Sequence, residues 1–441
     1  MEKSTLANLQ QIQEQLKKAD TTKIFFTDLN GRVVSLTVNP ENIVGIIENG
    51  VGFDGSSIAG YARVENSDRL LFPDPETFKL VPFADEMVGF FLGNIFNARG
   101  TRAPTDPRAA LENVVAEAES EFGYRFTVGP EHEFFILSSE IFSDQVHSDS
   151  AKYFLATPHD KGDVVRNRII DILKQCGIKF EKTHHEVTPS QHEINLEPAA
   201  PMKAADRTVL FNHITQKAAA ELGYHATFMS KPFNGFNRNA FHIHISMQDS
   251  GGNNLFYDEK GQFNLSGLAR QFIAGILKYA RETSVIMAST YNSYKAYVIE
   301  REAPIVRGWG YANRSSMVRI PYCDNPHATR MELRNPDATG NVYLQLAVLI
   351  GMGLRGIREK LDCGQPDARS TYNRSYRTRV LNRQFLPKSL FEALMEAEKS
   401  KFLREVLGNR LFENYLTLKT QQWEEHRTHV TPLEHEKYLM Y

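Results

Sequence analysis

Ionisable side chains inside otherwise apolar strand patterns limit how this chain can fold more than any other feature. In GPEHEFFIL (residues 129–137), Glu131 and Glu133 are two positions apart, so a strand presents both carboxylates on one face. A fold that buries such a strand has to neutralise the charges. The pattern recurs in four segments: GPEHEFFIL, HHEVTPSQHEINLE (184–197), FHIHIS (241–246) and MELR (331–334).

These segments predict a metal site. Burying an unpaired carboxylate costs several kcal/mol, and divalent cations are the natural counter-charge. Oxygen-rich ligand sets suit Mg²⁺, and a histidine among them also admits Mn²⁺. One such segment alone would fit a solvated strand face, but the four together indicate more than one metal ion. The candidates are Glu131, Glu133, Glu186, Glu193, Glu332, His242 and His244.

Arginine is concentrated around the last of these segments. Guanidinium groups match phosphate and carboxylate oxygens with paired hydrogen bonds. Surface salt bridges are the alternative, but here the arginines are interleaved with apolar strand residues, as in YANRSSMVRIP. Arginines beside metal ligands predict a polyphosphate site for phosphoryl transfer. The cluster consists of Arg301, Arg307, Arg314, Arg319, Arg330 and Arg334.

Charge, cysteine content and motifs exclude several classes of protein. The 441 residues carry 51 Lys plus Arg and 53 Asp plus Glu, so the net charge of −2 gives no overall attraction to nucleic acid or to an anionic membrane. Three cysteines without a Cys-x-x-Cys pair exclude a zinc ribbon and suit a reducing cytosol. Residues 50–55 fit G-x-G-x-x-G, but no helix start follows them, and a P-loop motif is absent.

The sequence pattern indicates neither a signal peptide nor a membrane-spanning segment. The first twenty residues are polar and lack the apolar core of a signal peptide. The longest apolar stretch, residues 342–354, contains Gln345 and is shorter than the roughly 20 residues that cross a bilayer. We therefore expect a cytoplasmic, multi-domain enzyme without nucleic-acid or membrane partners.

Turn residues at 97–108 divide the chain, and we expect one domain over 1–103 and a second over 104–441. Asp106 followed by Pro107 predicts a helix start just after the boundary. The first domain is expected to contain a helix over 4–18, a hairpin over 23–38 with an Asn30-Gly31 turn, and apolar runs at 70–72, 79–83 and 88–91.

The second domain is expected to alternate helices with strands. The predicted strands cover 124–128, 133–137, 180–185, 192–197, 242–247 and 331–334. The predicted helices cover 164–176, 207–222, Ser266 to about Thr283, 343–359 and about the last 50 residues.

In its sequence motifs, the chain resembles the bacterial and archaeal type I glutamine synthetases over nearly its whole length. The resemblance implies an α+β fold, with a small N-terminal β-grasp domain followed by a large catalytic α/β domain. It also implies a dodecamer of two hexameric rings, with each active site between neighbouring subunits. The segments that carry it are FDGSSIAGYARVENSD (53–68), GPEHEFFIL, HHEVTPSQHEI, HIHIS, NSYKAYVIEREAP (292–304), ANRSSMVRIP (312–321) and RMELRNPDATGNVYL (330–344).

The resemblance assigns roles to individual residues, with ATP and two or three Mg²⁺ or Mn²⁺ ions per site. Glu133, Glu186 and Glu193 would hold one metal ion, and Glu131, His242 and Glu332 the second. The nucleotide side would be formed by Glu181, His244, Ser246, Arg319 and Arg330, and the moving phosphoryl group would be met by Arg314 and Arg334. Glu302 resembles a flap residue that accepts a proton from the amine, Asp54 of the adjacent subunit resembles an ammonium site, and Tyr153 resembles a tyrosine near it.

The acid-substrate pocket departs from the family pattern. The segment Asn237 to Phe241 has Arg238 where the family has a glycine whose backbone approaches the substrate. Ala296 replaces an arginine that grips the α-carboxylate, a loss of roughly 1.5–3 kcal/mol of binding. His327 stands where the family usually has a lysine near the nucleotide.

Two interpretations of the pocket remain open. Arg238 compensates for Ala296 and glutamate is still bound, or the pocket serves another acid or an amine larger than ammonium. The leading prediction is a ligase that makes glutamine from glutamate and ammonia through γ-glutamyl phosphate. The alternatives are a related ligase with a different amine or acid, and a catalytically silent homologue.

Overall fold

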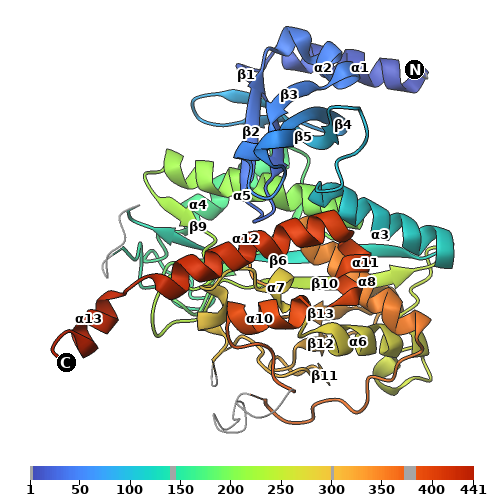
Figure 1. Ribbon diagram of the computed structural model, residues 1–441, viewed down its shortest axis with the longest axis vertical. Helices are drawn as coiled ribbons and strands as arrows, with labels where there is room; N and C mark the ends of the chain where they lie inside the picture. Colours follow the sequence, from blue (N-terminus) through green and yellow to red (C-terminus); the bar gives the residue numbers. More distant parts are fainter. Residues whose placement is uncertain (1–2, 140–145, 299–301, 372–383) are drawn as a thin grey trace.

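Two β-sheets follow one another along the chain in the computed structural model, which describes residues 3–139, 146–298, 302–371 and 384–441 (Figure 1). The first sheet has five strands in the order β2-β1-β5-β4-β3. Only β1 and β5 run parallel, and the other neighbours are antiparallel. The elements of this part are α1 (Lys3–Leu16), β1 (Thr21–Thr27), β2 (Val33–Val38), α2 (Ile43–Asn49), β3 (Val51–Asp54), β4 (Asp68–Pro82) and β5 (Met87–Asn97).

The predicted hairpin is confirmed. Two of the predicted apolar runs, by contrast, form a single strand. β1 and β2 pair antiparallel around a turn in which Gly31 has a φ of +85°, a conformation that favours glycine. The apolar runs at 70–72 and 79–83 both belong to β4. The pairing with β5 shifts register between Asp74 and Lys79, so the strand continues through the polar residues that suggested a break.

The second sheet has eight strands, ordered β11-β12-β13-β10-β6-β8-β7, with β9 also paired to β6. The predicted strands over 124–128 and 133–137 form a single strand here, because Pro130 fits within a continuous β6. The strands are β6 (Arg125–Leu137), β7 (Phe180–His185), β8 (Gln191–Leu196), β9 (His225–Thr227), β10 (Phe241–Gln248), β11 (Trp309–Tyr311), β12 (Val318–Ile320) and β13 (Met331–Leu333).

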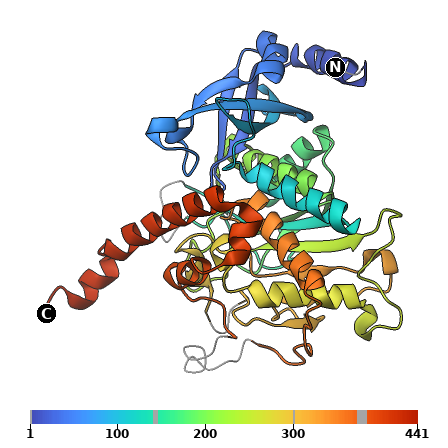
Figure 2. The same ribbon diagram turned by 45° about the vertical axis from the view of Figure 1, so that its right-hand side comes forward.

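Helices pack against this sheet and around the almost fully buried α8, which contacts α3, α5, α6 and α11. The described part of the chain contains no helix with the length and apolar character that a bilayer crossing requires. The C-terminal α13 extends away from the body of the molecule, and none of its residues is buried (Figure 2). The helices are α3 (Pro107–Phe122), α4 (Asp163–Gln175), α5 (Pro201–Glu221), α6 (Gly267–Tyr279), α7 (Ser284–Met287), α8 (Val342–Arg358), α10 (Leu390–Ala397), α11 (Lys401–Leu407), α12 (Asn409–Thr428) and α13 (Pro432–Tyr438).

Capping explains where several helices begin. The Asp106 side chain accepts a hydrogen bond from the backbone N–H of Arg108, with Pro107 as the first helical residue, as predicted. Ser266 caps α6 as predicted, but α6 ends at Tyr279, and the separate short α7 follows. α5 begins at residue 201, earlier than predicted, because Pro201 is a favourable first residue. The two sheets and their helices confirm the predicted α+β class.

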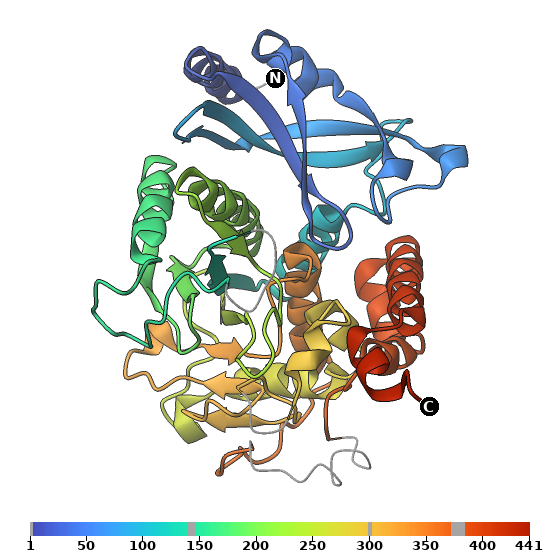
Figure 3. The same cartoon turned by 90° about the vertical axis from the view of Figure 1, so that its left-hand side faces the viewer.

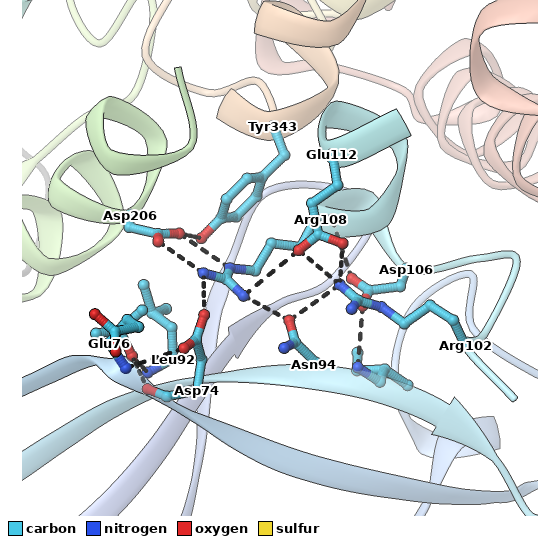
Figure 4. Close-up of polar contacts among 12 residues, drawn as sticks. Asp74, Glu76, Leu92, Asn94, Arg102, Asp106, Arg108, Glu112, Asp206 and Tyr343 are labelled. Carbon is cyan, nitrogen blue, oxygen red and sulfur yellow. Dashed lines mark hydrogen bonds and ion pairs between the residues drawn. The ribbon is translucent and has the colours of Figure 1, made fainter. Parts of the chain in front are cut away.

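A buried arginine joins the first sheet to helices that follow it in the chain. Arg108 on α3 binds Asp206 on α5 with Nη2 to Oδ2 at 2.8 Å, and Asp74 of the first sheet at 2.9 Å (Figure 4). Its Nη1 donates to Asn94 on β5, and the Tyr343 hydroxyl donates to Asp206 at 2.8 Å. Burial opposes the charge, but the hydrogen bonds to Asp206 raise the pKa of Arg108. The arginine therefore stays charged and holds the first sheet and the helices α3, α5 and α8 in one network.

The tip of the β1–β2 hairpin forms a second junction, between the first sheet and the helices α8 and α12 (Figure 3). The Asn341 side chain at the start of α8 donates to the Asp28 carbonyl at 2.9 Å. A Cβ atom on Gly31 would lie 2.7 Å from the Gly340 carbonyl oxygen, so the two backbones touch directly. Lys419 on α12 has no exposed surface and donates to Asn30 Oδ1 at 2.7 Å.

Lys419 makes stability depend on pH. Burial lowers the pKa of Lys419 to about 7, whereas a lysine in an unfolded chain titrates near about 10.4. Below pH 7 the cost of the buried ammonium is fully present, and it is relieved as the pH rises toward 10. We expect this group to increase the free energy of unfolding by up to about 5 kcal/mol over that range.

Urea midpoints at pH 7 and pH 9.5 test this expectation. Lys419→Met should raise the midpoint at pH 7 and lose most of that advantage at pH 9.5. The exposed Lys399→Met is the matched control and should follow the wild type at both pH values. Parallel pH profiles for wild type and Lys419→Met would contradict the expectation.

Candidate active site

Two adjoining cavities are lined by side chains of the eight-stranded sheet. The larger has a volume of about 490 Å³ and the smaller about 320 Å³. Four residues line both: Glu131, Lys182, His244 and Arg330. The larger cavity brings together most of the predicted site residues, namely Glu131, Glu133, Tyr153, Glu186, Glu193, His242, His244, Glu302, Arg314, Arg319, Arg330, Glu332 and Arg334.

Strand pairing collects these residues from distant parts of the sequence. Glu131 on β6 is paired with His242 on β10, and Glu133 is paired with Glu193 on β8. On the far side of β10, β13 adds Glu332. Directly opposed residues of antiparallel strands have Cβ atoms about 5 Å apart. The register alone therefore converts separate segments into one site.

The first acidic cluster consists of Glu131, His242 and Glu332, each offering an atom within 4.8 Å of the others. The Glu131 carboxylate lies 3.1 Å from His242 Nδ1 and 3.0 Å from His244 Nε2. Burial opposes its ionisation, but these hydrogen bonds hold the pKa of Glu131 well below its usual range. Burial, and then the charge of Arg334, lowers the pKa of His242, which favours the neutral imidazole that ligates metals.

The second acidic cluster consists of His184, Glu186 and Glu193, again with ligand atoms within 4.8 Å of one another. Burial and the charge of Glu186 raise the pKa of Glu133 beside it. Burial, followed by Glu131 and Glu133, raises the pKa of Glu193. These carboxylates repel one another, and the protein provides too little positive charge to offset them. A divalent cation fits this donor set.

His184 is a residue that the sequence prediction missed. Its Nε2 atom lies 2.9 Å from Glu186 Oε1, and its side chain is nearly buried. It precedes Glu186 by two positions, the same spacing that marks the other pairs. This spacing of two residues is the feature of the sequence that could have identified His184 as a site residue.

Glu332 connects the first acidic cluster to the arginines. Its Oε2 accepts a hydrogen bond from Arg319 Nη1 at 2.6 Å, and its Oε1 accepts one from Arg334. Despite burial, the charge of Arg334 lowers the pKa of Glu332 to about 2. The carboxylate thus remains ionised and holds two guanidinium groups at the cavity wall.

The predicted arginine cluster is only partly assembled here. Arg314, Arg319, Arg330 and Arg334 line the larger cavity. Arg307 instead donates to the Leu277 carbonyl at 3.3 Å and lines neither of the two cavities. Arg301 lies outside the described residues.

The smaller cavity contains most residues predicted for the nucleotide side. Glu181, Ser246 and His327 line it in addition to the four shared residues. Arg330 Nε donates to His244 Nδ1 at 3.2 Å, which fixes the shared wall. Arg319 lines the larger cavity only. The smaller cavity is therefore connected to the acidic clusters through a polar wall.

The predicted proton acceptor and its neighbours lie at the larger cavity. Desolvation, and then the charge of Glu186, raises the pKa of Glu302, while a hydrogen bond from Asn237 opposes the shift. A raised pKa brings a carboxylate closer to the range that suits a general base. Tyr153 also lines this cavity, with its ring stacked on Phe154 at 4.0 Å.

The guanidinium of Arg238 is buried and bound by backbone carbonyl groups. Arg238 is 5% exposed, and its guanidinium donates to the backbone carbonyls of Arg334 at 2.7 Å and Asn335 at 3.0 Å. The group also lies 5.5 Å from the centre of the Tyr297 ring. Neither Arg238 nor Ala296 is among the described residues that line the two cavities. Arg238 thus supports the backbone that carries Arg334.

Asp54 lies at the end of β3, outside both cavities of its own chain. Its carboxylate accepts hydrogen bonds from the hydroxyls of Ser56 and Ser57, both at 2.7 Å. The bonds from Ser56 and Ser57 lower the pKa of this exposed carboxyl. Its assignment to an ammonium site stays a prediction.

A buried polar network lies next to the second acidic cluster and involves the residues that precede its carboxylates in the sequence. His185 and His192 immediately precede two of the cluster carboxylates. Asp149 Oδ1 lies 2.9 Å from His185 Nε2, and Arg166 Nη1 lies 2.7 Å from His192 Nδ1. Arg166 also forms an ion pair with Asp160 at 2.8 Å, so a guanidinium already supplies the positive charge there. The network fixes the strands that present the carboxylates.

Comparison with known proteins identifies relatives of both parts of the chain. The family model "Glutamine synthetase, catalytic domain" matches residues 104–438, and "Glutamine synthetase, beta-Grasp domain" matches residues 18–98. The glutamine synthetase of Methanosarcina mazei is 38% identical over 419 residues, which cover 94% of this chain and 93% of the relative. That of Thermotoga maritima is 36% identical over 422 residues, 95% of each chain.

Solved structures agree with these sequence matches. A GmaS/ADP complex superposes with a TM-score of 0.87 at 28% identity, covering 98% of this chain and 99% of that one. Apo GmaS without ligand gives a TM-score of 0.86 at 29% identity, covering 96% of this chain and 98% of that one. The predicted β-grasp domain and large catalytic fold are confirmed by these matches.

Proposed function

The chain belongs to the glutamine synthetase family and is an ATP-dependent ligase, and from this premise we propose that it forms glutamine from glutamate and ammonia. A carboxylate oxygen of glutamate attacks the γ-phosphorus of ATP, and the bond to ADP breaks. Ammonia then attacks the γ-glutamyl phosphate, and inorganic phosphate leaves. The observation that carries this proposal is the pair of cavities that share one polar wall.

The two acidic clusters are the proposed metal sites. Glu131, His242 and Glu332 would hold one ion. Glu186 and Glu193 of the second cluster would hold another together with the neighbouring Glu133, and His184 lies close to them. Bound Mg²⁺ or Mn²⁺ supplies positive charge that offsets the charge of the transferring phosphoryl group. Burial, together with mutual repulsion, raises the pKa of Glu133 and Glu193, and this supports the assignment.

Other side chains of the cavities have roles that follow from their charge. The smaller cavity would take the nucleotide, between Glu181, Ser246 and Arg330. Arg314 and Arg334 would neutralise the phosphoryl group, because their guanidinium groups line the cavity that contains the carboxylate clusters. Glu302 would accept a proton from the attacking nitrogen.

We extend the proposal to an assembly of subunits. Because Asp54 lies outside the cavities of its own chain, an ammonium-binding role requires this carboxylate to come from a neighbouring subunit. A dodecamer of two hexameric rings would provide that neighbour.

A ligase for a larger amine is the second candidate. Ala296 lacks a charged group, and the guanidinium of Arg238 is bound by backbone carbonyl groups. The structural similarity to GmaS supports considering a γ-glutamylamine product beside glutamine. The acidic clusters and the four arginines that line the larger cavity support an active ligase over a silent homologue.

Phosphate release from ATP and Mg²⁺ distinguishes the candidates. Glutamate is supplied with ammonium, hydroxylamine or methylamine, and omission of glutamate is the control. We expect glutamate-dependent release with ammonium, accompanied by glutamine.

Release with methylamine and not with ammonium would establish the second candidate instead. Absence of release with every nitrogen source, from protein that still binds ATP and Mn²⁺, would reject glutamate as the acid.

A further inference from the structure

Lys182 on β7 is a cation located between the two acidic clusters. Its Nζ atom lies 3.8 Å from Glu131 Oε1 and 3.9 Å from Glu193 Oε1. Glu131 belongs to the first cluster and Glu193 to the second, so one ammonium group faces both. Its side chain is 56% exposed and can therefore move.

Lys182 lines both cavities because of a local irregularity in β7. The pairing of β7 with β8 changes register between Phe180 and Lys182, so Glu181 is an extra residue in the strand. Such bulges redirect side chains. As a result, Glu181 and Lys182 both line the smaller cavity, although consecutive residues of a regular strand point to opposite faces. Lys182 can thus reach the nucleotide side as well as the carboxylates.

The ammonium group and divalent cations compete for the same negative charge. A cation bound to either cluster would share a carboxylate with Lys182 at a few ångströms, where like charges repel strongly. Lys182 then needs another anion. The polyphosphate of a nucleotide in the smaller cavity provides one, and a lysine on a flexible stem binds phosphate as a point charge.

We propose that Lys182 is a mobile counter-cation that exchanges Glu131 and Glu193 for the nucleotide phosphates when divalent metal binds. This inference rests on the proposed function in taking the acidic clusters as metal sites and the smaller cavity as the nucleotide site. It makes Lys182 a competitor of the metal ions and a ligand of the nucleotide at the same time. The two roles predict effects of opposite sign when the charge is removed.

Equilibrium binding to the full-length protein tests both roles. Lys182→Met removes the charge and keeps the stem. Mn²⁺ binding to the metal-free protein is followed by electron paramagnetic resonance of free Mn²⁺, and ATP binding is followed by calorimetry at saturating Mg²⁺ without glutamate. We expect Lys182→Met to bind Mn²⁺ about threefold to tenfold more tightly and ATP about tenfold more weakly.

Two variants serve as controls. Lys179→Met removes a lysine whose side chain is 78% exposed and which pairs with Glu197 at 3.7 Å, outside both cavities. It should leave both affinities unchanged. Lys182→Arg keeps the positive charge and should restore most of the ATP affinity.

Unchanged or weaker Mn²⁺ binding by Lys182→Met would overturn the proposal, and so would tighter Mn²⁺ binding with unchanged ATP affinity. Neither measurement requires turnover. A protein that shows both expected shifts but releases no phosphate with glutamate would leave the role of Lys182 intact and reject the proposed reaction.

Discussion

Glu193→Gln is expected to decrease the rate of ligation by about 10²–10³-fold while making the metal-free protein more stable. Glu193 is buried at β8, and its raised pKa shows that ionisation is unfavourable among Glu131, Glu133 and Glu186. A neutral glutamine of the same shape removes that repulsion. It also removes the charge by which the second acidic cluster would hold a cation.

Two measurements on the same samples test whether the substitution stabilises the metal-free protein and weakens its stabilisation by metal. Thermal unfolding in EDTA should show a midpoint above that of the wild type, and added Mn²⁺ should stabilise the variant less than the wild type. Glu197→Gln is the control, because its half-exposed carboxylate lies near the end of the same strand and outside both cavities. A variant that is less stable than wild type in EDTA and gains as much from Mn²⁺ would contradict the assignment.

Arg108→Met is expected to destabilise the protein by about 3–5 kcal/mol. The substitution leaves Asp74 and Asp206 without their shared cation, and both carboxylates are largely shielded from water. Since Asp74 lies on β4 of the first sheet and Asp206 on helix α5, the loss should weaken the junction between the first sheet and the helices α3 and α5 (Figure 4).

Chemical unfolding and limited proteolysis measure the two effects separately. The midpoint of unfolding should fall, and cleavage around residues 97–106 should become faster. Arg358→Met is the matched control, because this arginine pairs with Glu117 and Glu121 at a largely exposed site. Such surface pairs contribute about 1 kcal/mol or less. Equal effects of the two substitutions would show that burial of Arg108 has no special importance.

The parts of the fold that follow from local patterns were predictable from the sequence. The caps at Asp106 and Ser266 and the β1–β2 hairpin depend on neighbouring residues, and each was placed correctly. The same holds for the alternation that put Glu131 and Glu133 on one strand. Helix caps, hairpin turns and strand alternation are each determined by residues that lie close together in the sequence.

The missed features depend on contacts between distant segments. Pairing with β10 and β8 keeps β6 continuous through Pro130, and the register shift opposite β5 carries β4 past Asp74. The bulge that redirects Lys182 is defined only against β8. The direction of Arg238 depends on carbonyl groups almost a hundred residues later in the chain.

The wall shared by the two cavities has a thermodynamic consequence. Glu131, Lys182, His244 and Arg330 face both spaces, so a ligand in one changes the charges and positions that the other ligand meets. The binding affinities are then coupled, and by linkage each ligand alters the affinity of the other by the same factor. On the proposed assignment, metal and nucleotide therefore bind as a coupled pair, and an affinity measured for one of them applies only at a stated occupancy of the other.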